Sequence, residues 1–221
     1  MTSHDIARVR ADFDQIASFG EQSGVDRYDA LLLSLVPSSA LDVLEVGCGS
    51  GRLTAAIAGA ERKVVGLDLS PAMIERARRE SSPLVSFTCG DFLTHDFNGA
   101  QFDCVVTAAA LHHMPMEPSI RKMVGLLRPR GRLIVHDLRR DDGVADSIRA
   151  YLTLGHHALL RFMRTGRLRT PLHVRAAWLR HGRDEHYLSW REVERAADAL
   201  LPQSRVFYHW MWRYTIVWNK P

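Results

Sequence analysis

Apolar and polar positions along the chain follow two different periods. Short runs rich in β-branched and aliphatic residues occur at 43–46, 63–69, 85–93, 101–107 and 132–138. Segments between several of these runs, such as 53–58, have the apolar spacing of helices. Strands that alternate with helices are typical of a mainly parallel sheet with helices on both faces. The pattern therefore predicts an α/β fold with three layers.

The two ends of the chain contain further patterned segments. Ser189 and Glu192 have the spacing of a capping box, which predicts the start of a helix. Pro37 predicts the end of another helix near the N-terminus. We expect helices at 4–20, 24–36 and 189–200, β-rich runs at 205–209 and 213–218, and a single domain over residues 1–221.

Residues 139–183 depart from this pattern. They contain ten arginines and no lysine against three acids, together with an apolar, helix-like stretch at 148–163. One interpretation is a basic lid over an anionic or membrane-associated ligand. The others are a solvated Arg-rich face, or a dimer surface that uses the planar guanidinium group. The sequence leaves all three interpretations open.

Composition narrows the class of protein. Apolar residues make up 46% of the chain and charged residues 24%, which is ordinary for a globular protein. The net charge of +4 is mild for a nucleic-acid binder, although a pI near 9.2 leaves contact with a membrane surface possible. Cys48, Cys89 and Cys104 form no C-x-x-C pair, so we expect neither disulfides nor a metal site. The N-terminus lacks a signal-peptide pattern and no apolar stretch is long enough to cross a bilayer, so we expect a cytoplasmic protein.

A glycine-rich turn follows the first predicted strand. Gly47, Gly49 and Gly51 stand at every second position, and Glu45 lies two residues before the first of them. The dinucleotide fingerprint has the spacing G-x-G-x-x-G, in which the third glycine comes one residue later. A pyrophosphate would be repelled by Glu45, whereas a cationic ligand would be attracted. The turn therefore indicates a nucleoside cofactor with a positive charge.

The segment 43–51 resembles the first motif of the class I family of methyltransferases that depend on S-adenosylmethionine (SAM), h-h-E/D-h-G-x-G-x-G. Residues 127–133 are similar to the family's L-K-P-G-G-x-L segment, with Arg130 in place of the first glycine. The resemblance implies a Rossmann-like sandwich with a seven-stranded, mostly parallel sheet whose last strand is antiparallel. It also implies N-terminal helices (4–36) over the methionine end of the cofactor and a helical lid at about 139–185.

Further acids fit the same cofactor, SAM, and its product S-adenosylhomocysteine. Asp68 ends the second apolar run seventeen residues beyond Gly51, where a carboxylate can accept hydrogen bonds from both ribose hydroxyls. In the family a G-D-h step holds adenine, and Asp91 and Phe92 match it, while Met73 offers apolar cover for the ring. The expected cofactor-binding residues are Glu45, Gly47, Gly49, Gly51, Asp68, Leu69, Met73, Gly90, Asp91, Phe92 and Ala108.

Two histidines follow the fourth predicted strand, where the family places the methyl acceptor. A histidine with a pKa near its usual value of about 6.5 suits removal of the acceptor's proton at neutral pH. We therefore expect His113, or else His112, to be the catalytic base. Asp137, at the end of the fifth strand, is expected to orient that imidazole, to bind the acceptor, or to pair with Arg139 or Arg140.

The acceptor is expected to be a small organic molecule methylated at an oxygen, nitrogen or carbon atom. Family members that methylate nucleobase amines carry N/D-P-P-Y/F/W after the fourth strand, and this chain has Thr-Ala-Ala-Ala at 107–110. One alternative is a non-catalytic SAM-binding protein with the same fold. Another is an RNA methyltransferase that uses the Arg-rich insertion, although the mild charge makes nucleic acid a less favoured partner. Both a monomer and a homodimer fit the sequence.

Overall fold

A seven-stranded sheet forms the centre of the computed structural model, which describes residues 3–19, 28–59, 61–79, 83–140, 143, 172–182, 185, 187–209 and 212–221. The strand order is β3-β2-β1-β4-β5-β7-β6. Strands β1 to β5 are parallel, whereas β7 runs antiparallel to both β5 and β6. The strands are β1 (Asp42–Val46), β2 (Lys63–Asp68), β3 (Val85–Cys89), β4 (Phe102–Ala108), β5 (Leu127–Leu138), β6 (Arg205–His209) and β7 (Arg213–Asn219). The predicted fold class is confirmed.

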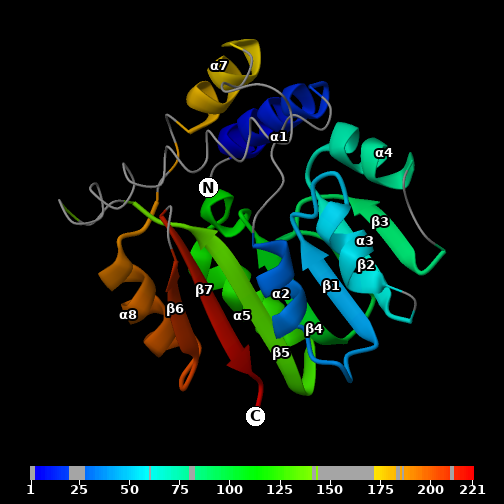
Figure 1. The fold of residues 1–221 in the computed structure, drawn as a ribbon, viewed down its shortest axis with the longest axis vertical. Helices are drawn as coiled ribbons and strands as arrows, with labels where there is room; N and C mark the ends of the chain where they lie inside the picture. The colour runs from blue at the N-terminus through cyan, green and yellow to red at the C-terminus, as the bar shows by residue number, and fades with distance from the viewer. Residues whose placement is uncertain are drawn as a thin grey trace.

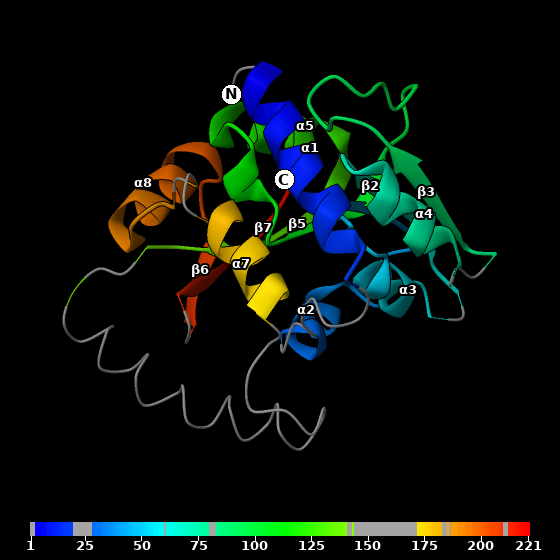
Figure 2. The ribbon, with the colours of Figure 1, turned by 90° about the horizontal axis from the view of Figure 1, so that it is seen from above.

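Helices cover both faces of the sheet, because its central strands are apolar on both sides. Neighbouring residues Val105 and Val106 of β4 are both fully buried, one in each of the two main core clusters. Figure 2 shows α2 and α3 on one side of the sheet and α5 and α8 on the other. The described helices are α1 (Ser3–Ala17), α2 (Asp29–Leu35), α3 (Arg52–Ala58), α4 (Pro71–Arg79), α5 (Met116–Leu126), α7 (Leu172–His181) and α8 (Trp190–Leu200), with a 3₁₀ turn, η2 (Leu111–His113).

The winding of the sheet reverses between β1 and β4, which are hydrogen-bonded neighbours. The chain leaves β1 toward α3 and β2 on one side, and leaves β4 toward η2 and α5 on the other. This reversal opens a crevice beyond the carboxyl ends of the two strands, the usual ligand site of open α/β sheets. Helices α1 and α7 pack together above this end of the sheet (Figure 1).

Two predicted boundaries were wrong. The third strand ends at Cys89 and not at residue 93, because the Asp91 carboxylate accepts the N–H of Leu93 at 3.0 Å and closes a turn. The fifth strand begins at Leu127 and not at residue 132, so residues 128–131 belong to β5, where the pairing with β4 shifts register. Arg130 has a left-handed φ of 64° there, a conformation that favours the glycine of the family motif.

Other predictions fall partly outside the described residues. Helix α2 begins at Asp29, and residues 24–27 of the second predicted helix (24–36) are not described. Most of the Arg-rich segment, residues 141–142 and 144–171, also lies outside the described part, so the lid stays a prediction. Helix α7, from the end of that segment, packs against α1. Within the described ranges, no helix combines the length and apolar character needed to cross a bilayer.

Candidate functional site

The glycine turn after β1 bends back sharply toward β2. Gly47, Gly49 and Gly51 all have left-handed φ angles, of 74°, 52° and 77°. The N–H of Gly47 donates to the carbonyl of Leu67 at 2.7 Å, which fixes the turn against β2. A side chain on Gly47 would place its Cβ 2.3 Å from the Cβ of Ala110, while nothing lies within 4 Å of a Cβ built on Gly49. The turn is therefore tight on one side and open on the other.

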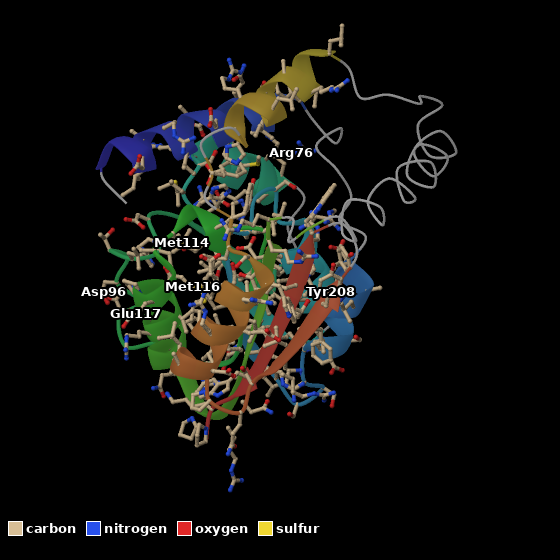
Figure 3. All side chains as sticks on the ribbon, turned by 90° about the vertical axis from the view of Figure 1, so that its left-hand side faces the viewer. Arg76, Asp96, Met114, Met116, Glu117 and Tyr208 are labelled. Carbon is tan, nitrogen blue, oxygen red and sulfur yellow. The ribbon has the colours of Figure 1, made fainter. Side chains whose placement is uncertain are left out.

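A pocket of about 260 Å³ lies beyond the turn. All the predicted cofactor-binding residues line it, apart from Gly51. Gly51 instead faces Phe87 and Ala77, which leave no room for a side chain, so its function is packing. The other pocket residues are Val9, Phe13, Ile16, Asp29, Val46, Cys48, Ser50, Arg52, Leu53, Leu67, Ala109, Ala110, His113 and Met114. Figure 3 shows Met114, one of these pocket residues, below helix α1 on the side that faces the sheet.

Asp68 holds the two sides of the turn together. Its carboxylate oxygens accept the N–H groups of Gly49 at 2.8 Å and Ser70 at 2.9 Å. Burial raises the pKa of Asp68 from its usual value, and these two hydrogen bonds oppose the increase. The hydroxyl of Ser70 donates to Asp14 of α1 at 2.5 Å, which links the N-terminal helix to the start of α4.

The pocket is acidic. Asp29, Glu45, Asp68 and Asp91 line it, and Arg52, the one arginine among the described residues of its wall, is paired with Asp29. Glu45 is buried, with 2% of its surface exposed, and accepts the hydroxyl of Thr54 at 2.5 Å. Burial raises the pKa of Glu45 to about 8, although the hydrogen bond from Thr54 opposes the increase. A positive charge bound nearby would stabilise the ionised form of Glu45.

The two histidines after β4 have different surroundings. The N–H and Nδ1 of His112 both face the Asp137 carboxylate, at 2.7 and 2.6 Å. His113 lines the pocket, and its Nδ1 lies 3.0 Å from the carboxylate of Glu185. Asp137 therefore orients His112 and not the preferred base, His113. Arg139, one of the predicted partners of Asp137, donates to Tyr208 instead.

Burial and charge set the protonation of these groups. Burial lowers the pKa of His113, so its imidazole is neutral near pH 7. Burial acts to raise the pKa of Asp137, but the charge and hydrogen bond of His112 outweigh it and hold that pKa below its usual range. Burial also acts to raise the pKa of Glu185, but the hydrogen bond to His113 and the attraction of the surrounding histidines together outweigh it and lower that pKa to about 2. Both carboxylates are ionised and accept the imidazole N–H groups.

Comparison with known proteins identifies the family. A methyltransferase domain model matches residues 43–131. An uncharacterized methyltransferase of Bacillus velezensis is 32% identical over 143 residues, which cover 62% of this chain and 67% of that protein. The chain belongs to the class I SAM-dependent methyltransferases. It spans little more than half the length of further curated relatives, such as a methyltransferase of Mycobacterium bovis that is 36% identical over 110 residues (49% of this chain, 56% of the other).

Solved methyltransferases share the fold. The N-methyltransferase NodS of Bradyrhizobium japonicum, in complex with S-adenosylhomocysteine, superposes with a TM-score of 0.66 at 18% identity, over 96% of this chain and 98% of that one. Magnesium protoporphyrin IX methyltransferase of Synechocystis, with bound SAM, gives 0.62 at 14% identity, over 98% and 97%. The ligand bound in these two neighbours is SAM or its demethylated product. The pocket fits it, because the acidic wall suits a cation and the open side of Gly49 lets a ligand approach the backbone closely.

Several side chains of this methyltransferase site were missed by the sequence analysis. Glu185 bonds to His113 from 72 residues away, and His181 reaches Asp12 from 169 residues away. Thr54, which donates to Glu45, lies in α3, and its neighbours in the sequence form no pattern that predicts a buried hydrogen bond. No local spacing marks such pairs, because each is brought together only by the packing of α1 and α7 or by the turn into α3.

Proposed function

We propose that the protein transfers the methyl group of SAM to a small organic acceptor, at an oxygen, nitrogen or carbon atom, and that His113 takes the proton of that acceptor. The observation that carries the proposal is the position of His113. It is the one predicted catalytic residue in the wall of the cofactor pocket, opposite the acids expected to bind SAM.

The cofactor-binding roles follow from where the residues lie. Asp68 would accept the ribose hydroxyls with the lone pairs that Gly49 and Ser70 leave open. Asp91 and Phe92 would hold adenine, with Leu69 and Met73 as apolar cover. Glu45 would stabilise the positive end of the cofactor. Bound SAM supplies a methyl group that its sulfonium has already activated, so the protein's task is to position the acceptor and remove its proton.

His113 has the features of a base. Glu185 accepts its Nδ1–H, so the lone pair lies on Nε2, and the neutral ring can accept a proton there. The ionised Glu185 would stabilise the imidazolium that forms, as in other base–carboxylate pairs. Phe13 packs its edge against His113 with ring centroids 5.3 Å apart, which helps to exclude water. His112 stays the second candidate, held to β5 by Asp137.

A small acceptor fits the walls of the pocket better than RNA does. Val9, Phe13 and Ile16 of α1 form an apolar wall that encloses the pocket. Such a wall suits an organic molecule that is largely buried on binding. The RNA alternative depends on arginines that lie mainly outside the described residues. The non-catalytic alternative would leave the pair of His113 and Glu185 without a catalytic function.

The test is a methyl-transfer assay with a panel of phenols, amines and indoles, together with calorimetric titration of S-adenosylhomocysteine. We expect tight binding and transfer to at least one acceptor class. His113→Ala should lower turnover by about 10²–10⁴-fold while cofactor affinity changes by less than about threefold, because a general base acts only on the chemical step. His209→Ala, outside the pocket, is the control. Unchanged turnover in His113→Ala would contradict the assignment of His113 as the base. Binding of S-adenosylhomocysteine without methyl transfer to any acceptor would support the non-catalytic alternative.

A further inference from the structure

Three histidines meet beside the cofactor pocket. His112 and His113 come from η2, and His181 comes from the last turn of α7. One ring nitrogen of each lies within 4.8 Å of a ring nitrogen of the other two. The ring centroid of His113 is 3.8 Å from that of His112 and 4.8 Å from that of His181. The cluster therefore depends on the packing of α7 beside α1, which Figure 1 shows above the strand ends.

Each of these imidazoles has a carboxylate at its Nδ1. The distances are 2.6 Å from His112 to Asp137, 3.0 Å from His113 to Glu185 and 3.2 Å from His181 to Asp12. A carboxylate at Nδ1 fixes the tautomer and directs the lone pair to Nε2. This is the arrangement found around histidines that bind metal ions, where the second nitrogen donates to a carboxylate.

Two other histidines of the chain show a different pattern. Nδ1 of His136 and Nε2 of His209 both lie 2.8 Å from the hydroxyl of Thr215. A shared hydroxyl suits histidines that only pack, since it satisfies polar atoms and adds no charge. Three separate carboxylates around three adjacent imidazoles go beyond what packing requires.

The charges of the cluster favour a dication. Asp137, Glu185 and Asp12 supply three negative charges close together, and their side chains are 1%, 4% and 17% exposed. Arg8 pairs with both Glu185 and Asp12 and supplies one positive charge. A metal ion binds only neutral imidazoles, and the three carboxylates with Arg8 then leave two negative charges, which one divalent ion would balance. Buried charge of this size is costly unless it is paired.

We infer that His112, His113 and His181 bind a divalent transition-metal ion, with Zn²⁺ as the best match. Three histidines and one open position are a ligand set of catalytic zinc sites. Tetrahedral Zn–N bonds of about 2.0–2.1 Å require nitrogens roughly 3.3 Å apart. The three rings would therefore close inward by up to about 1.5 Å, which small side-chain rotations allow. The absence of a C-x-x-C pair predicted no metal site, and the histidines form no local metal motif either, because His181 lies 68 residues after His113.

The ion would act in the proposed methyl transfer, on which this step rests, but it would activate the acceptor in place of the His113 base. Because His113 also lines the pocket, the open position lies next to the cofactor site. A hydroxyl or phenol bound there would lose its proton to solvent, since a bound zinc ion strongly lowers the pKa of its ligand. The resulting anion would form the new bond to the methyl carbon as the S–CH₃ bond breaks. The ion would then replace His113 as the group that activates the acceptor, because it uses the same lone pair.

The test is metal binding by the untagged full-length chain, stripped with EDTA and titrated with Co²⁺. Neither cofactor nor acceptor is present, so a failure here is distinct from a failure of methyl transfer. We expect one Co²⁺ per chain, an intense visible absorption band typical of tetrahedral cobalt, and displacement by one equivalent of Zn²⁺. His181→Ala should weaken Co²⁺ binding by more than about 100-fold, because it removes a ligand.

Asp12→Asn keeps all three ligands and tests the carboxylates. It should weaken binding by about 10–100-fold, the usual effect of losing such a partner. His209→Ala should bind Co²⁺ like the unaltered chain. Thermal melting in EDTA checks that each variant is folded. An absent band, or equal affinity for Co²⁺ in the unaltered chain, His181→Ala and Asp12→Asn, would overturn the inference.

Discussion

The cofactor side and the acceptor side of the pocket are built in different ways. On the cofactor side, groups close in sequence or on adjacent strands meet through the backbone: Gly47 donates to Leu67, and Asp68 accepts from Gly49 and Ser70. On the acceptor side, side chains bond to side chains from distant segments, as in the pair of His113 and Glu185. Helix α1 supplies pocket residues to that side, and His181 of α7, which residues 18–171 separate from α1 in the sequence, packs against His113 behind it.

This difference has a physical cause and a consequence. A backbone site needs only a turn of defined shape at a strand end, so its form is largely independent of the acceptor. A side-chain site can change with each substitution in α1, α7 or η2. We infer that the cofactor side can stay constant while the acceptor side adapts to different substrates. The predictions that follow test how separate the two sides are.

The largest effect is expected from Gly47→Ala, because Gly47 touches both sides. Its Cβ would lie 2.3 Å from the Cβ of Ala110, the residue that precedes η2, and its φ is left-handed. We expect a loss of roughly 2–5 kcal/mol in the free energy of unfolding, from overpacking and backbone strain together. Affinity for S-adenosylhomocysteine should fall at least about tenfold.

Gly59→Ala is the matched control. Gly59 has a φ of 51°, but no atom lies within 4 Å of the place that a Cβ would take, so only the strain of its sparsely populated backbone conformation applies, at about 1–3 kcal/mol. Urea unfolding and calorimetry measure both quantities. If the two variants lose equal stability and equal affinity, the contact with Ala110 does not couple the two sides.

The same contrast explains what the sequence could predict. The glycine spacing and the acids at strand ends are local signals, and they placed Glu45, Asp68 and Asp91 in one pocket. The apolar runs also predicted the strands of the sheet, because the length and apolar pattern of a segment decide whether it forms a buried strand. Glu185 and His181 carry no such signal, because their use depends on where α7 lies. Gly51 differs from these acids: its motif position suggested a ligand, and the structure adds a need for glycine in packing, because Phe87 and Ala77 leave no room for a Cβ.

A smaller effect is expected from pH, through Glu45. The pKa of Glu45 is raised to about 8 in the folded protein, against an ordinary value of 4.5. The folded state therefore holds a proton that the unfolded state releases, and this contribution to stability is lost as pH rises through about 8. Cationic SAM favours the ionised form. Its affinity should thus increase from pH 6 to pH 8, by up to about tenfold per pH unit, and then level off.

Glu45→Gln separates this effect from the titration of other groups. The amide oxygen can still accept the hydroxyl of Thr54, but no carboxyl proton is left to release. SAM affinity measured by calorimetry should be weaker at pH 8 in this variant and nearly flat from pH 6 to pH 8. A slope equal to that of the unaltered protein would assign the pH dependence to another group on the cofactor side.

The smallest effect concerns Lys122, an exception to the local character of the cofactor side. From α5, its Nζ donates to the carbonyls of Leu93 and His95 at 3.0 and 2.7 Å, and it lies 5.3 Å from the ring centroid of Phe92. Lys122→Met keeps the apolar stem but loses both hydrogen bonds, so the loop that carries Asp91 should loosen. We expect SAM affinity to fall by about three- to tenfold, equivalent to roughly one hydrogen bond.

Lys220→Met provides the comparison, because Lys220 also donates to two carbonyls, those of Val124 and Leu127, at 3.0 and 2.6 Å, but these carbonyls lie in α5 and β5 and not in the loop after β3. Both variants should lose about 1 kcal/mol of stability, since each gives up hydrogen bonds of the same kind. Only Lys122→Met should also lose SAM affinity. Equal affinity in the two variants would mean that the loop after β3 keeps its shape without α5, and that the cofactor side is local throughout.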